Sequence, residues 1–113
     1  MKNPAHHKDE KAASLISKFA AEYFSIESNK DSMMTVTHTE MLDRGKRAMV
    51  YFTALPQEKE QEALEFAKRR RQDFRQFIIG KKSFGFAPRI DFSIDLGEHN
   101  RQRIDELLNE DQK

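Results

Sequence analysis

Apolar positions at helical spacing predict the first element of the chain. From residue 10 to about residue 24, apolar side chains recur every three or four positions and so share one face of a helix. They are Ala12, Leu15, Ile16, Phe19, Ala20, Tyr23 and Phe24. Residues 1–9 show no such period and offer little apolar surface to bury, so we predict a disordered lead-in before the helix.

Two segments with a period of two follow the first helix. In residues 33–41, Thr35, Thr37 and Thr39 alternate with a second set of side chains that includes His38, and β-branched residues at this period are typical of a strand. Residues 47–55 alternate in the same way, with small and apolar side chains on one side. Because a turn-forming segment separates the two runs, we predict a β-hairpin.

A long helical pattern with one defect comes next. Pro56 suits a helix start, the acids at positions 58, 60 and 62 complement the positive end of a helix, and Gly80 suits its end. On an unbroken helix the apolar stripe would contain Arg70, which would then have to extend its charge out of the stripe. Residues 68–73 contain no apolar side chain, which favours two shorter helices that meet at a kink.

The last part of the chain completes the predicted fold. Residues 89–95 alternate Ile90 and Phe92 with polar side chains, which predicts a third strand after Pro88, and residues 98–108 predict a short acidic helix. The order is helix, strand, strand, helix, kink, helix, strand. We therefore predict an α+β fold in which helices cover one face of a three-stranded sheet, with a folded domain at 10–95 and an acidic tail at 96–113.

Charge is unevenly distributed along these elements. The 113 residues suffice for one domain and carry a net charge of only +1, yet residues 68–89 combine eight basic side chains with one acid, Asp73. This density is typical of a surface that binds phosphate backbones, although such runs often form a solvated helix face. The candidate nucleic-acid-binding residues are Lys68, Arg69, Arg70, Arg71, Arg75, Lys81, Lys82 and Arg89, with a second, weaker group at Arg44, Lys46 and Arg47.

Several kinds of chemistry have no sign in the sequence. The absence of cysteine removes disulfides and thiolate metal sites, and the four histidines do not stand at metal-ligand spacing. No nucleophile elbow or phosphate-binding loop is present. We therefore predict no catalytic residue, metal, cofactor or small-molecule substrate. With no apolar run long enough for a bilayer and no secretory signal, we expect a cytoplasmic protein without a membrane partner.

Several short motifs resemble those of one known family. They are the strand opening at 34–37, the second strand at 48–52, Arg75 in the helix after the kink, the segment 88–95 and the tail motif 103–108. Over about residues 10–108 the chain resembles the ribosome-binding factor A family, small bacterial proteins that associate with the small ribosomal subunit. The family interrupts its long helix with a small residue and a spacer, often followed by Gly. This chain has two arginines and a glutamine at that place.

The resemblance implies a type II KH-like fold and a function without catalysis. The expected function is that of a ribosome assembly factor that binds the small (30S) subunit and its rRNA, supports late rRNA maturation and matters for growth in the cold. We expect electrostatic docking of the basic segment on rRNA phosphates, and a monomer.

Three alternatives remain open at this point. The chain could be a protein-interaction adaptor that uses its Phe-rich helix face, or another KH-like RNA-binding module. The third is a small acylphosphatase-like hydrolase, which would need a Gly-rich anion loop near the N-terminus, whereas residues 1–30 contain no glycine. Salt-sensitive RNA binding would separate the RNA-binding alternatives from the adaptor and the hydrolase.

Overall fold

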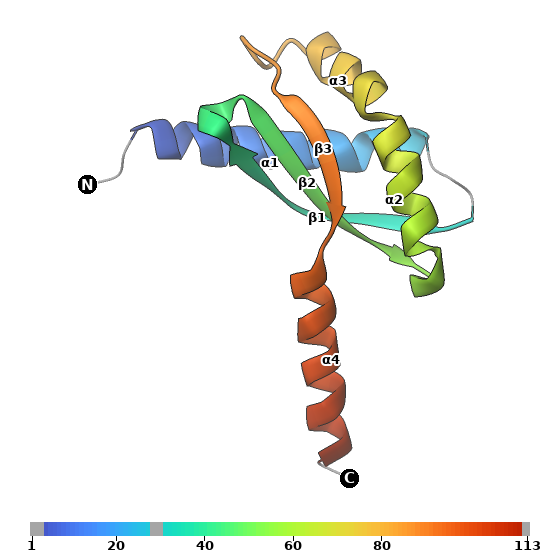
Figure 1. Ribbon diagram of the computed structural model, residues 1–113. Coiled ribbons are helices and arrows are strands. Elements are labelled where there is room, and N and C mark those ends of the chain that lie inside the picture. The colour runs from blue at the N-terminus through green and yellow to red at the C-terminus, as the bar shows by residue number, and fades with distance from the viewer. Residues whose placement is uncertain (1–3, 28–30, 112–113) are drawn as a thin grey trace.

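The elements follow the predicted order in the computed structural model, which describes residues 4–27 and 31–111 (Figure 1). They are α1 (Pro4–Ile26), β1 (Met33–Leu42), β2 (Arg47–Leu55), α2 (Glu60–Arg69), α3 (Arg71–Gly80), β3 (Arg89–Ile94) and α4 (Leu96–Asp111). Short 3-10 turns lie at Asp43–Gly45 and Gln57–Lys59. No helix in the described ranges is long and apolar enough to cross a membrane.

The first helix begins earlier than its apolar pattern predicts. Residues 4–9 belong to α1, so the prediction of a disordered lead-in is wrong for them, while residues 1–3 lie outside the described part of the chain. Pro4 is compatible with the first turn, where its missing N–H is not needed. Once the apolar turns further along are fixed against the sheet, each added residue extends the helix at little cost.

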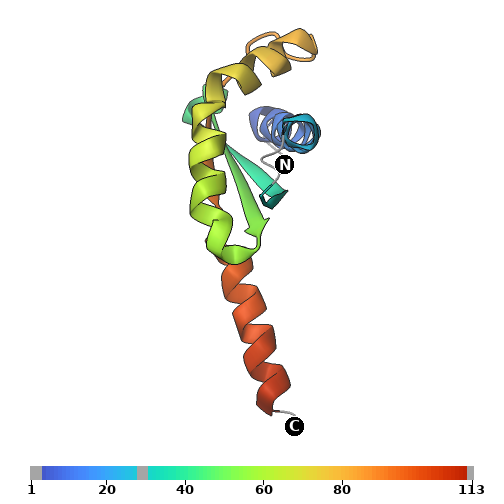
Figure 2. The ribbon, with the colours of Figure 1, turned by 90° about the vertical axis from the view of Figure 1, so that its right-hand side faces the viewer.

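The sheet has the strand order β1-β2-β3 and buries one face. β1 runs antiparallel to β2, which confirms the hairpin, and β3 runs parallel to β2. The buried side chains of the strands and of the three helices α1, α2 and α3 form one core, which confirms the predicted α+β fold. In Figures 1 and 2, α1 runs along one side of the sheet and α3 arches above it. The large side chains at the centre are Ile16, Val50, Phe52, Phe74, Ile78 and Phe92.

The predicted kink lies at Arg70. This residue separates α2 from α3 with φ −96° and ψ 6°, outside the helical range. The bend lets each short helix present its own apolar side to the core, with Ala67 buried before it and Phe74 buried after it. The Arg70 side chain lies outside the stripe, with its guanidinium 3.4 Å from the Glu27 carboxylate and 5.0 Å from the centre of the Phe66 ring.

A β-bulge changes which side chains of β1 reach the core. The pairing with β2 shifts between Val36 and His38, so His38 lies opposite Tyr51 and the alternation is reset. Thr39 is consequently buried and its hydroxyl is 2.8 Å from that of Ser17 in α1. The predicted grouping of Thr39 with Thr35 and Thr37 on one side is therefore wrong, because uninterrupted alternation does not allow for the extra residue.

The acidic tail forms α4, which projects away from the body (Figure 1). Asp95 joins β3 to α4: one carboxylate oxygen accepts the backbone N–H of Glu98 at 2.9 Å, as a helix cap does. His99 lies 2.5 Å from the Glu60 carboxylate and ties the first turn of α4 to α2. The basic residues gather near the start of β3, at Arg89, whereas α4 follows the opposite end of that strand. The acidic tail therefore does not fold against the basic residues.

Candidate nucleic-acid interface

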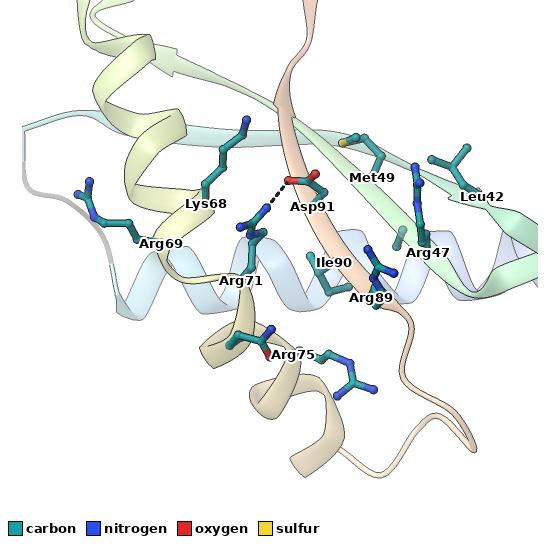
Figure 3. A pocket seen from close by; sticks show the side chains of 12 residues that line it. Leu42, Arg47, Met49, Lys68, Arg69, Arg71, Arg75, Arg89, Ile90 and Asp91 are labelled. Atoms are coloured by element: carbon teal, nitrogen blue, oxygen red, sulfur yellow. Dashed lines mark hydrogen bonds and ion pairs between the residues drawn. The ribbon is translucent and has the colours of Figure 1, made fainter.

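A basic groove lies where the helix bend meets the free edge of β3. It has a volume of about 530 Å³ and draws its walls from the end of β1, the start of β2, the end of α2, the start of α3 and the start of β3 (Figure 3). Asp91 is its only acidic lining residue in the described part of the chain. The cationic lining residues, which define the basic groove here, are Arg47, Lys68, Arg69, Arg71, Arg75 and Arg89.

Strand pairing brings two of these cations together. In the parallel register of β2 and β3, Arg47 lies opposite Arg89. Like charges at directly opposed positions repel one another, so an anion that lies between or above them relieves this repulsion. Arg47 has a partial partner in Asp43, 3.5 Å away, whereas the described residues provide no ion pair for Arg89.

The bend supplies the other wall of the groove. Lys68 precedes Arg70 on α2 and Arg71 follows it on α3, so the bend places both beside β3 (Figure 3). Lys68 has no ion-pair partner among the described residues, and Arg69 extends from the far side of α2 and forms the outer rim.

Among the described residues, Arg71 forms the one ion pair between side chains that line the groove. Its guanidinium is 3.4 Å from the Asp91 carboxylate, and both side chains are about half exposed, 47% and 46%. Pairs this exposed contribute only about 0–1 kcal/mol, so a phosphate can replace Asp91 as the partner at little cost. Asp91 also accepts the backbone N–H of Phe92 at 2.9 Å, which satisfies it in part when Arg71 leaves.

Arg75 has a structural task in addition to its charge. It donates hydrogen bonds to the backbone carbonyls of Ala87 at 2.9 Å and Pro88 at 3.2 Å. These bonds hold the segment that leads into β3 and thereby fix Arg89 relative to α3. Arg75 is therefore a positioning residue for the groove as well as part of its lining.

The remaining predicted cations lie outside the basic groove. Arg70 reaches Glu27 on the opposite side of the bend, and Lys81 is 3.0 Å from Glu22 with its ammonium 4.7 Å from the centre of the Phe77 ring. Three others do not line the groove either: Lys82, Arg44 and Lys46. The charge pattern did not select several groove residues, among them Leu42, Met49, Gln72 and Asp91. Leu42, Met49 and Asp91 lie in strands, at positions where side-chain alternation places them on the exposed side.

The one acid of the basic segment is turned away from the groove. The Tyr23 hydroxyl in α1 donates to the Asp73 carboxylate at 2.5 Å. Burial, reinforced by the hydrogen bond and the charge of Asp73, raises the pKa of Tyr23 to about 12. This contact connects α1 to α3. Because it holds the Asp73 carboxylate outside the groove, the positive charge of the groove is not neutralised by that residue. No cluster of metal-ligating side chains exists within the described residues.

Comparisons with known proteins give a consistent result. The family model described as ribosome-binding factor A matches residues 8–108. The chain belongs to this family. A comparison with curated proteins finds no match. Membership in the ribosome-binding factor A family confirms the predicted relationship and supports a ribosome-binding factor.

Two solved structures share the fold of the chain. The crystal structure of ribosome-binding factor A from Thermus thermophilus has 18% sequence identity and a TM-score of 0.66, over 76% of this chain and 94% of that one. The solution NMR structure of a Thermotoga maritima protein described as a ribosome binding factor A has 28% identity and a TM-score of 0.64, over 82% and 91%. A KH-like arrangement is consistent with both likenesses.

Proposed function

We propose that this protein is a non-enzymatic assembly factor that binds the small (30S) ribosomal subunit and supports late maturation of its rRNA. In this proposal it works as a monomer in the cytoplasm, and it matters most for growth in the cold. The family supports the ribosome as partner. The observation that carries the rRNA contact is the basic groove, where Lys68 and Arg89 have no acidic partner among the described residues.

The groove matches the requirements of a phosphate backbone. Arginine and lysine side chains neutralise phosphates and release the counterions condensed around RNA, which makes binding favourable and strongly dependent on salt. The cations come from α2, α3, β2 and β3, so they are fixed relative to one another by the fold. Contacts of this kind orient a protein on RNA without reading its sequence. The protein would therefore hold an rRNA segment in place during maturation.

An adaptor that docks partners on a Phe-rich helix face finds no support. Phe74 is fully buried, and Phe66 and Phe77 pack against the same core. Most of the surface of these rings is therefore used in packing against the core.

Co-sedimentation with purified 30S subunits tests the proposal. We expect wild-type protein to sediment with the subunits at low salt and to be released at raised salt. The triple variant Lys68→Gln, Arg71→Gln, Arg89→Gln should lose most of this association. The slope of the logarithm of its association constant against the logarithm of the salt concentration should be shallower by about one unit per cation removed.

A charge-matched control completes the experiment. The triple variant Lys11→Gln, Lys18→Gln, Lys82→Gln removes the same charge from exposed positions outside the basic groove. It should sediment like wild type. Equal loss of binding in both triple variants would show a general charge effect and would contradict a role for the groove, and failure of wild type to bind at any salt would overturn the proposed function.

A further inference from the structure

The side of the sheet opposite the core, here called the open face, carries a stacked pair of rings. His38 of β1 and Tyr51 of β2 are directly opposite in the register, with ring centroids 4.5 Å apart and planes within 11°. The His38 side chain is 48% exposed. Two flat rings stacked on an exposed sheet offer a surface on which a further ring can stack.

Hydrogen bonds hold both rings in place. The His38 Nδ1 atom is 3.3 Å from an oxygen of Asp95 and 3.3 Å from the Thr37 hydroxyl, and the Tyr51 hydroxyl donates to Glu40 at 3.3 Å. The bulge in β1 is what turns His38 outward, because uninterrupted alternation after Val36 would point it into the core. The ring pair is thus fixed before any ligand arrives, which reduces the entropy lost on binding.

A polar cleft opens beside the rings. It has a volume of about 690 Å³ and lies between the open face and the base of α4, which is ample for a nucleotide-sized group. Its hydroxyl and amide groups both donate and accept hydrogen bonds, as the edge of a nucleobase requires. These groups belong to Thr35, Thr53 and Gln57. His99 and Arg101 also line the cleft, where they already pair with Glu60 and Glu98.

The outward-facing side chains of β2 lead from the basic groove to the cleft. Side chains two residues apart on a strand lie on the same face, about 7 Å apart. Arg47 and Met49 line the groove, Tyr51 forms the ring pair and Thr53 lines the cleft. A single RNA strand whose backbone lies in the groove can therefore place a base on the open face.

Charge decides which part of the nucleotide fits here. Glu40 lies beside Tyr51, and the carboxylate of Asp95 is held by the hydroxyl of Thr37 at 2.6 Å, which keeps the pKa of Asp95 below its usual range. These negative charges repel phosphate but not a neutral base. We propose that the open face binds an unpaired RNA base, stacked on the His38–Tyr51 pair with its edge in the cleft. This inference rests on the proposed rRNA binding and adds the recognition of single-stranded bases to it.

Binding to two oligomers of equal charge tests this proposal. One is an oligouridine RNA, and the other is an abasic oligomer of the same length and the same number of phosphates. We expect wild-type protein to bind the RNA about tenfold more tightly, because base stacking on aromatic side chains adds to the phosphate contacts. The double variant His38→Thr, Tyr51→Leu should bind both oligomers equally, with unchanged affinity for the abasic one.

A reciprocal variant and a direct readout separate the two proposals. Arg89→Gln should weaken binding of both oligomers by the same factor and preserve their ratio. In NMR spectra, the ring protons of His38 should move upfield with the RNA and stay in place with the abasic oligomer. Equal binding of both oligomers by wild type would overturn the base site and leave phosphate binding intact. Binding of neither oligomer would overturn this inference together with the RNA contact of the proposed function.

Discussion

The two sides of the helix bend carry the same residue types in different electrostatic settings. On the β3 side, Lys68 and Arg89 have no acidic partner among the described residues, and Arg71 has only an exposed one. On the α1 side, Arg70 and Lys81 each have a carboxylate partner and an aromatic ring beneath the charge. The cations of the first side remain available to an anion, and those of the second are used to hold the protein together.

This difference shows why charge density alone does not define a binding surface. A cation that already has a carboxylate and a ring loses those contacts when it turns to a phosphate, so its net gain is small. A cation that faces another cation loses no such contact when it binds a phosphate, so it gains the full interaction energy with that phosphate. Partners, not position in the basic segment, therefore decide the role of each residue.

The largest expected effect concerns the packing that fixes the bend. Phe74 is fully buried and its ring contacts those of Tyr23, Phe24 and Phe92. Phe74→Ala should lower the free energy of unfolding by about 3–5 kcal/mol, measured by urea denaturation. Phe86→Ala, at a residue that is 66% exposed, is the control and should change it by less than about 0.5 kcal/mol. Similar losses in the two variants would show that the bend does not depend on this packing.

The next effect concerns the acid that is turned away from the groove. Tyr23→Phe removes the hydrogen bond to Asp73 and should cost about 1.5–3 kcal/mol at neutral pH, because the acceptor is charged. Since the pKa of Tyr23 is raised to about 12 in the folded protein, its contribution is complete below pH 10 and is lost as the pH rises from 10 to 12. Between pH 10 and pH 12, the free energy of unfolding, measured by denaturation, should fall more steeply with pH for wild type than for the variant. Parallel curves would contradict the assigned contact.

A smaller effect is expected for a paired cation on the α1 side. Lys81→Gln removes the ion pair with Glu22 and the contact with the ring of Phe77, and should cost about 0.5–1 kcal/mol of stability. Thermal denaturation measures this loss. The affinity of the same variant for 30S subunits should equal that of wild type, and a clear drop in affinity would place Lys81 among the binding residues after all.

Much of this fold could be predicted because it depends on local pattern. The apolar stripe fails at Arg70, and the structure bends at that residue. The bulge in β1 leaves no such sign, because threonine at successive odd positions fits an uninterrupted strand equally well. The helical start at Pro4 was missed because it depends on the turns that follow it and not on apolar residues of its own.

The division of the cations could not be predicted from the sequence. The partner of Arg70 is Glu27, just after the end of α1, and the partner of Lys81 is Glu22 in α1; these lie 43 and 59 positions away along the chain. Likewise, Arg47 comes to face Arg89 only because β3 runs parallel beside β2. A linear charge pattern contains neither kind of contact, so it marked one continuous basic segment where the structure has two different surfaces.

The most direct test compares two neighbouring arginines on opposite sides of the bend. Arg70→Gln and Arg71→Gln remove the same charge from adjacent positions, and binding to 30S subunits is measured for both across a series of salt concentrations. We predict that Arg71→Gln binds more weakly and with a salt slope shallower by about one unit, while Arg70→Gln binds like wild type and is only less stable. Equal weakening by both variants would contradict the division of the basic segment into a binding surface and a structural one.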